Sequence, residues 1–418
     1  MENSVIILLQ VVFWSPVVLL GFSYAIYPWL LKTLGQGRPL SGERFVEEEE
    51  FPEVAVLMAV YNEEAVLSET LQSIFESDYP KDKIRVLIGS DGSTDRSHEI
   101  IQGFQRNHPE LDLKIFPGRN GKIRIVNQLA KDAADSFLDR ENAAFVLCDA
   151  NVAWSEKALR NMVRHLKRSD VGMIGSCVRD KQINHTGIGH EEEAYVGREN
   201  QTKYFEGVLW GNMMGGFGAC YALRAELFAP VPEEYIVDDF YQTMACLKTG
   251  SKAIVDLEAE VYESVSVEIE EEFRRKTRIA TGNFQNLSHF GNFFLPWNGR
   301  LANAFAFWSH KGIRWFGPHL LVLMTISVVI LSALNPLYLI PLGGLLTSVL
   351  LALLDWGMSL RIAPHVKFFR FIRYFYAMNG AVFLGWVAFQ RGVSNSVWEP
   401  TKRVERGDVI ERVEATAK

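Results

Sequence analysis

The sequence predicts an α/β domain with a mostly parallel sheet, accompanied by helices that are long and apolar enough to cross a membrane. Between about residues 50 and 290, short apolar runs alternate with amphipathic segments. This alternation is typical of parallel strands that are joined by helices. Uncharged stretches lie near both ends of the chain, and each has the length that a bilayer core of roughly 30 Å requires.

The N-terminal stretch carries no charged residue from Val5 to Leu31. The chain begins Met-Glu-Asn, whereas a cleaved signal peptide begins with basic residues. Lys32 and Arg38 follow the stretch, and basic residues favour the cytoplasmic side of a membrane. We therefore expect residues 1–34 to be an uncleaved transmembrane anchor in a multi-pass protein of the inner or plasma membrane, with a cytoplasmic domain at 50–290.

A second uncharged region, residues 315–354, predicts two further spans, with a turn at Asn335-Pro336. The segment near 357–373 is basic and aromatic, which is typical of an amphipathic helix on a membrane surface. A short uncharged stretch over 374–390 is a further candidate for a span, and it decides on which side the tail lies. We expect interfacial helices at 291–316, a membrane region at 317–390 and a polar tail at 391–418.

The composition limits the classes of function. With 43 Lys and Arg against 50 Asp and Glu, the formal net charge is −7, so nucleic acid is not an expected partner. The four cysteines are widely spaced and form no CxxC pair. This spacing favours neither a disulfide framework nor a zinc site. Oligomeric state and partner subunits are left open.

Apolar runs of strand length in the middle of the chain are followed by polar motifs. The runs are Val54–Val60, Ile84–Ser90, Leu113–Phe116, Phe145–Asp149 and Val171–Ser176. Tyr61-Asn62-Glu63 follows the first run, Asp91 follows the second, and Asp149 ends the fourth. Ligands of parallel sheets bind beyond the carboxyl ends of the strands. The sequence therefore predicts one pocket that is lined by residues far apart in the chain.

The motifs indicate how this pocket would hold a nucleotide. The chain has no GxGxxG after the first strand and no GxxxxGK[ST], so a backbone cradle for phosphates is not expected. Asp149-Ala150-Asn151 instead places two oxygen ligands on the same side of an extended segment. Such a pair suits Mg²⁺ or Mn²⁺ bound to a diphosphate.

With these motifs in order, the chain resembles the membrane-bound family 2 glycosyltransferases, a group that includes cellulose, chitin, hyaluronan and poly-N-acetylglucosamine synthases. The matching segments are Ala59–Glu64, Ser90–Asp95, Gly121-Lys122, Asp149–Asn151, Gly215–Ala219, Val237–Asp239 and Arg275–Ile279. Residues 309–315, and Trp398 and Arg403 in the tail, also resemble segments of bacterial members. The resemblance covers nearly the whole chain and implies a GT-A-type, Rossmann-like domain that binds a nucleotide sugar.

The resemblance also implies roles for individual residues. The nucleotide-sugar-binding residues would be Ala59, Tyr61, Glu63, Asp91, Lys122, Asp149, Arg275 and Arg278. Within this set, Tyr61 and Glu63 would contact the base, and Asp91 would read the uracil edge. The acceptor would lie near Gly216, Phe217, Gly218 and Asp238. Asp149 and Asn151 would hold Mg²⁺ or Mn²⁺, and Asp239 would be the general base.

Two departures from the family pattern bear on metal and product. Asn151 stands where the family has a second Asp, which implies weaker binding of the metal. Arg275 replaces a Gln, and Ile279 replaces the Trp that stacks on the acceptor sugar in processive members. The second change favours shorter products.

The expected reaction is inverting, metal-dependent transfer of a sugar from a UDP-sugar donor at the cytoplasmic membrane face. Two hypotheses describe the acceptor: a growing polysaccharide, which the protein would pass through its own spans, or a lipid-linked acceptor that receives a single sugar. A third hypothesis is a membrane scaffold that has lost catalysis. The retention of Asp91, Asp149, Asp239 and Arg278 argues against the third hypothesis.

Overall fold

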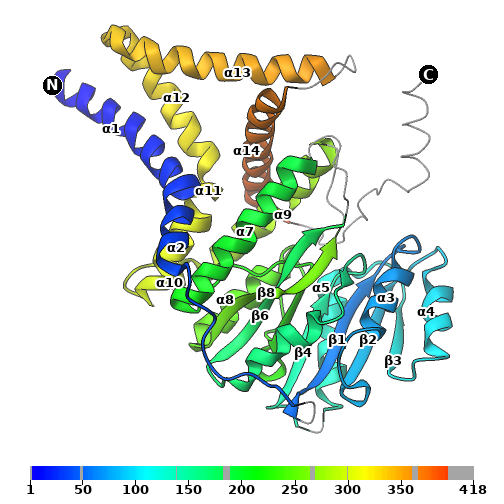
Figure 1. Ribbon diagram of the computed structural model, residues 1–418. Helices are drawn as coiled ribbons and strands as arrows, with labels where there is room; N and C mark the ends of the chain where they lie inside the picture. Colours follow the sequence, from blue (N-terminus) through cyan, green and yellow to red (C-terminus); the bar gives the residue numbers. More distant parts are fainter. Residues whose placement is uncertain are drawn as a thin grey trace. The chain divides into compact units, whose positions relative to one another are not determined.

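The computed structural model forms two compact units, one α/β and one helical (Figure 1). It describes residues 2–47, 50–137, 139–181, 189–263, 269–298, 300–359 and 366–393. The α/β unit contains Leu40–Asn184 and Gly215–Ser266, and the helical unit contains Met1–Pro39, His185–Met214 and Val267–Val393. The predicted tail beyond residue 393, with Trp398 and Arg403, lies outside the described residues.

Among the described residues, eight strands of the α/β unit form one sheet in the order β3-β2-β1-β4-β7-β6-β8-β5. The strands are β1 Glu53–Val60, β2 Ile84–Asp91, β3 Leu111–Phe116, β4 Ala143–Cys148, β5 Ala153–Trp154, β6 Val171–Asp180, β7 Cys220–Arg224 and β8 Lys252–Glu263. The predicted fold class is therefore confirmed. The apolar runs did not predict β5, β7 and β8, because β5 and β7 are short and β8 is interrupted by charged residues.

The pairing of β1 determines where the polar motifs meet. This strand is buried from Val54 to Val60, and it pairs in parallel with β2 on one side and β4 on the other. Val60 lies opposite Ser90 and Leu57 lies opposite Leu147. Since parallel strands end at the same edge, the segments that follow β1, β2 and β4 share one edge of the sheet.

Helices cover this sheet through apolar faces. They are α3 Leu67–Phe75, α4 Ser97–Gln105, α5 Lys122–Ala134, α6 Ala158–Val163 and α8 Asp238–Thr249. The helix α5 packs on β1 and β2 and buries Ile125, Leu129 and Ala133, which recur at helical spacing. The helix α6 packs on β6 and β8. Burial of α5 fixes its N-terminus next to the edge where β2 ends.

The helical unit contains three helical stretches that are long and apolar enough to cross a membrane, among the described residues. They are Ser4–Gly35, Gly317–Leu334 and Pro336–Ser359. The helices of this unit are α1 Glu2–Gly21, α2 Tyr27–Gly35, α7 Gly189–Trp210, α9 Ile269–Phe290, α10 Leu301–Phe307, α11 Ile313–Trp315, α12 Gly317–Leu334, α13 Leu339–Ser359 and α14 Lys367–Arg391, with π-helical turns η1 Phe22–Ile26 and η7 Trp308–Gly312. Most side chains of the three stretches are not covered by the protein itself, as expected of helices that face lipid.

The C-terminal helices differ in part from the prediction. A turn at Asn335 separates α12 from α13, as the sequence indicates, and the Asn335 side chain accepts a hydrogen bond from the Leu337 N–H. The amphipathic helix expected near 357–373 is not a separate element among the described residues. Its first residues end α13, residues 360–365 are not described, and Lys367 begins a helix that continues to Arg391. No proline interrupts 367–391, so the basic segment and the uncharged stretch form one helix.

Buried polar side chains join the helices of the helical unit. The two ring nitrogens of His310 lie 2.8 Å from Glu206 and 3.1 Å from Glu199, both on α7. The Tyr27 hydroxyl donates to Glu206 at 2.9 Å, and Arg314 donates to Glu199 at 2.8 Å. Removing one partner of such a buried network leaves uncompensated charge. These contacts therefore fix α2, α7, η7 and α11 against one another.

Gly92 allows the loops after β2 and β3 to approach closely, and its substitution tests this contact. Its φ is +71°, and a Cβ atom there would lie 2.8 Å from the Gly118 carbonyl oxygen. We expect Gly92→Ala to lower the free energy of unfolding by about 1–3 kcal/mol.

Gly103 is the control, because it lies in α4 and a Cβ atom there would meet no atom within 4 Å. Gly103→Ala should stabilise the protein by about 0.5–1 kcal/mol. Denaturant unfolding in detergent measures both values. Equal effects of the two substitutions would contradict the close approach at Gly92.

Candidate functional site

The loops that follow β1 and β2 are hydrogen-bonded to each other. The Asn62 side chain accepts from the Thr94 N–H at 2.8 Å, and the Glu64 N–H donates to Asp95 at 2.9 Å. Asn62 has a φ of +51°, a conformation that Asn tolerates better than most residues. The neighbouring Glu63 side chain is buried. The first two sequence motifs therefore form one continuous rim at the edge of the sheet.

Asp91 holds the loop that leads into α5. Its side chain is fully buried, and its two oxygens accept hydrogen bonds from the Asn120 N–H at 2.5 Å and the Gly121 N–H at 3.1 Å. Gly121 has a φ of +90° and immediately precedes the helix. Asp91 thereby sets the position at which Lys122 begins α5. A direct contact of Asp91 with a base stays a prediction.

Arg119 is a residue of this site that the sequence reasoning missed. Its guanidinium lies over the Tyr61 ring, 3.3 Å from the ring centroid, and its Nε donates to Asp91 at 3.2 Å. A cation over an aromatic face is a favourable contact. The sequence could have indicated Arg119 through its position in a polar loop after β3, Gly118-Arg119-Asn120-Gly121.

Lys122 contacts two other predicted site residues, Asp149 and Asp238. Its Nζ lies 2.8 Å from Asp149 Oδ1, just beyond β4, and 3.4 Å from Asp238 Oδ2, at the start of α8. Burial alone would lower the pKa of Lys122, but the carboxylates of Asp149 and Asp238 outweigh burial and raise the pKa above its usual value. The side chain is therefore an ammonium ion between two carboxylates.

Asp238 and Asp239 are the first two residues of α8, where the helix dipole favours negative charge. Asp238 is buried and Asp239 is half-buried. The glycine-rich segment lies against this turn, because a Cβ atom on Gly218 would be 3.2 Å from Asp239 Oδ2. The Gly216 N–H also donates to Thr243 Oγ1 at 2.9 Å. The structure thus brings the two predicted motifs together.

The site supplies some of the oxygen ligands that a hard divalent cation needs, but not a full set. Within the described ranges, no three His, Cys, Asp or Glu side chains form a metal-binding cluster. Asp149 contacts Lys122, and the Asn151 amide donates to Glu263 at 3.1 Å. Asp238 Oδ2 is buried and accepts no hydrogen bond from the described residues. Carboxylate oxygens suit Mg²⁺ or Mn²⁺, but a bound group would have to supply further ligands.

Three other predicted residues belong to β1 or to the helical unit. Ala59 is buried in β1 opposite Gly89. Arg275 and Arg278 lie on α9 of the helical unit, where Arg275 contacts Glu272 and Glu192 at 2.8 Å each. The roles of these residues, like those of all the other predicted site residues, stay predictions.

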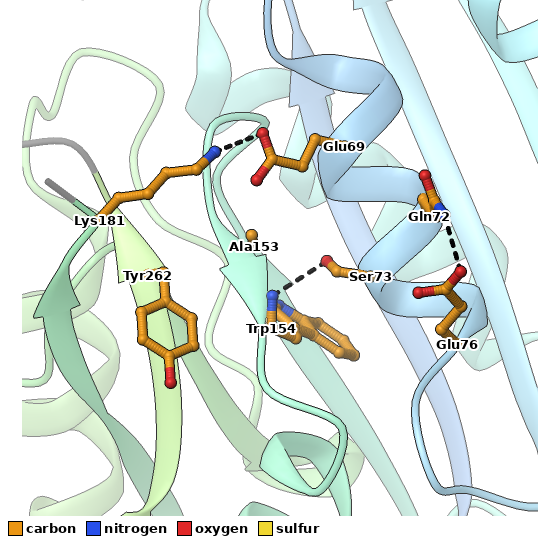
Figure 2. Close-up of a pocket in the computed structure, with 8 residues that line it drawn as sticks. All are labelled: Glu69, Gln72, Ser73, Glu76, Ala153, Trp154, Lys181 and Tyr262. Atoms are coloured by element: carbon orange, nitrogen blue, oxygen red, sulfur yellow. Dashed lines mark hydrogen bonds and ion pairs between the residues drawn. The ribbon is translucent and has the colours of Figure 1, made fainter. Parts of the chain in front are cut away.

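A hollow of ≈ 280 Å³ lies between α3, β5 and β8 (Figure 2). Its lining residues are Glu69, Gln72, Ser73, Glu76, Ala153, Trp154, Lys181 and Tyr262. Lys181 pairs with Glu69, Gln72 donates to Glu76, and the backbone N–H of Trp154 donates to Ser73 (Figure 2). The hollow contains none of the predicted site residues, so we do not assign it to the site.

Family models match most of the chain. Glycosyl transferase family 2 matches residues 55–230, and Glycosyl transferase family group 2 matches residues 144–360, more than half of the chain. The mannosyltransferase from Pyrobaculum calidifontis, solved with GDP-Man and Mn²⁺, is similar in structure with a TM-score of 0.64 and 21% identity. The superposition covers 93% of this chain and 99% of that one, and it supports a GT-A fold.

Curated relatives include proteins with different acceptors. The chain is 27% identical over 202 residues to β-monoglucosyldiacylglycerol synthase of Synechocystis, covering 46% of this chain and 40% of that protein. It is 29% identical over 126 residues to poly-β-1,6-N-acetyl-D-glucosamine synthase of Staphylococcus epidermidis, covering 29% and 27%. The chain thus spans less than half of the length of either relative. From the family match and the fold, the chain belongs to glycosyltransferase family 2, whose members transfer sugars from nucleotide-sugar donors.

Proposed function

We propose that the protein transfers a sugar from a UDP-sugar to an acceptor hydroxyl at the cytoplasmic face of a membrane, with inversion at the anomeric carbon. The observation that carries this proposal is the contact of Lys122 with Asp149 and Asp238 beside Asp239. Lys122, the cation that would bind the donor diphosphate, and Asp239, the carboxylate that would take the acceptor proton, therefore lie at the same edge of the sheet. The choice of uracil rests on the resemblance of Ser90–Asp95 to the family motif.

On the donor side, the leaving diphosphate develops negative charge as the glycosyl–phosphate bond breaks. The Lys122 ammonium would bind this charge. Mg²⁺ or Mn²⁺ held by Asp149 and Asn151 would supply further stabilisation of the diphosphate. Tyr61 offers an aromatic ring to the base, and Arg119 stacks on that ring. Arg275 and Arg278 stay candidates for the diphosphate.

On the acceptor side, the attacking hydroxyl must lose its proton. Asp239 is half-buried at the N-terminus of α8 and lies against Gly218. Its carboxylate would accept this proton as the general base. A single displacement inverts the configuration, so an α-linked donor gives a β-linked product. The reaction needs no covalent glycosyl-enzyme intermediate.

The acceptor is either a growing polysaccharide or a lipid-linked molecule. Extension of a polysaccharide agrees with the similarity to a poly-N-acetylglucosamine synthase. Transfer of one sugar to a lipid-linked acceptor agrees with the similarity to β-monoglucosyldiacylglycerol synthase and with Ile279 in place of an aromatic residue. The three apolar helical stretches support a place in the membrane for both.

Asp239→Asn tests the general base. The amide keeps the shape of the side chain but cannot accept the proton, so we expect the transfer rate to fall by about 10²–10⁴-fold. The affinity for UDP should stay unchanged in calorimetry. Glu234→Gln is the control, because Glu234 is exposed in the loop before α8. Parallel loss of UDP binding and transfer in Asp239→Asn would make Asp239 a structural residue.

The product distinguishes the two acceptors. Purified protein in lipid receives Mg²⁺ or Mn²⁺ and a panel of UDP-sugars, and the products are weighed by mass spectrometry. A ladder of regularly spaced masses from one donor would identify a polysaccharide synthase and its monomer. One sugar increment on a lipid would identify the single-step transferase. Binding of UDP without any transfer would favour the inactive scaffold.

A further inference from the structure

The Lys122 ammonium lies between Asp149, the proposed metal ligand, and Asp238, which directly precedes the proposed general base Asp239. The Lys122 side chain is 24% exposed, against 34% for Asp149 and 10% for Asp238. The field of Asp239 also favours the ammonium form. Lys122 is therefore a cation that Asp149 and Asp238 share.

One carboxylate oxygen of Asp238 is held only loosely. Its Oδ2 atom is buried without a hydrogen bond from the described part of the chain, and its nearest cation there is Lys122 Nζ at 3.4 Å. An ionised carboxylate is costly to bury without a partner, and Lys122 is a partner of this one, with Oδ1 at 3.5 Å. Asp238 and Asp149 thus contact the same ammonium group.

A divalent cation and the ammonium of Lys122 compete for Asp149. The ammonium lies 2.8 Å from Asp149 Oδ1, which is the distance of a charge-assisted hydrogen bond. Two cations on one carboxylate repel each other, so each weakens the binding of the other to Asp149. A diphosphate offers the ammonium a new partner with more negative charge than Asp149.

We propose that Lys122 couples donor binding to cation binding: its ammonium holds Asp149 and Asp238 in the free enzyme, and the donor diphosphate draws it away and frees Asp149 for the divalent cation. This inference rests on the proposed function, since it assumes a diphosphate donor and a cation at Asp149. Linkage makes the coupling reciprocal, so each ligand strengthens the binding of the other by the same factor.

The experiment measures Mn²⁺ binding to the purified full chain in detergent, by electron paramagnetic resonance of the free ion, with and without UDP or GDP. In the wild type we expect the nucleotide to tighten Mn²⁺ binding by about 5–150-fold, the usual range of coupling. UMP, which has one phosphate, should tighten it less. Lys122→Met should bind Mn²⁺ alone more tightly than the wild type, and the coupling should fall below the wild-type value, to the part that direct contact of the diphosphate with the cation supplies.

Two further variants keep the test decisive. Lys122→Arg retains the charge and should retain the weak binding of Mn²⁺ alone and the coupling, even if Lys122→Met unfolds. Lys114→Met is the matched control, because Lys114 is an exposed lysine that pairs with Asp132 at 2.6 Å, and it should change neither quantity. Melting of Lys122→Met should begin at a lower temperature than in the wild type and recover with Mn²⁺, because the cation replaces the lost charge.

Each outcome separates the inference from the proposed function. Independent binding of nucleotide and Mn²⁺ to the wild type would overturn the coupling and leave the proposed function standing. Full coupling in Lys122→Met, or loss of coupling in Lys122→Arg, would overturn the role of the lysine charge. Failure of the wild type to bind UDP and GDP would overturn the proposed function and this inference together.

Discussion

The parallel pairing of β1 with β2 and β4 is the constraint on which the candidate site depends. Strands that run in the same direction end at the same edge, so three segments that are distant in the chain meet there. The motif after β1 can then hydrogen-bond the motif after β2, and Asp149 can meet the first residue of α5. An antiparallel β4 would place Asp149 at the opposite edge of the sheet.

The motif residues serve the fold as well as the proposed chemistry. Asp91 uses both carboxylate oxygens to hold the loop at Asn120 and Gly121, and this loop sets where Lys122 begins its helix. Asn62 and Thr94 similarly link two loops. Loss of activity after substitution of such a residue would therefore combine misplacement of neighbours with loss of a ligand contact. Asp239, which is half-buried at the sheet edge, allows a cleaner separation of the two effects.

The helical unit depends on polar contacts that hydropathy does not reveal. Glu199 and Glu206 lie on α7, which is not among the apolar stretches that could cross a membrane. They are buried against His310 and Arg314, more than a hundred residues away in the chain. In the sequence they look like charges on a solvated helix, because only packing against other helices buries them. The length of α14 was underestimated for a related reason, since a change in polarity at residue 374 does not break a helix.

The sequence by itself determined the fold class, the strands β1, β2, β3, β4 and β6, the apolar helices and most of the polar residues at the sheet edge. These follow from local composition, because a buried parallel strand must be apolar throughout and its polar successor must lie at the edge. Only the tertiary structure decided the partners: Arg119 over Tyr61, Asn151 beside Glu263, and Lys122 between Asp149 and Asp238. These pairs depend on strand order and helix packing, and neither leaves a periodic signal in the chain. The antiparallel pairing of β7 with β4 is of the same kind, since it is set by neighbours in the sheet.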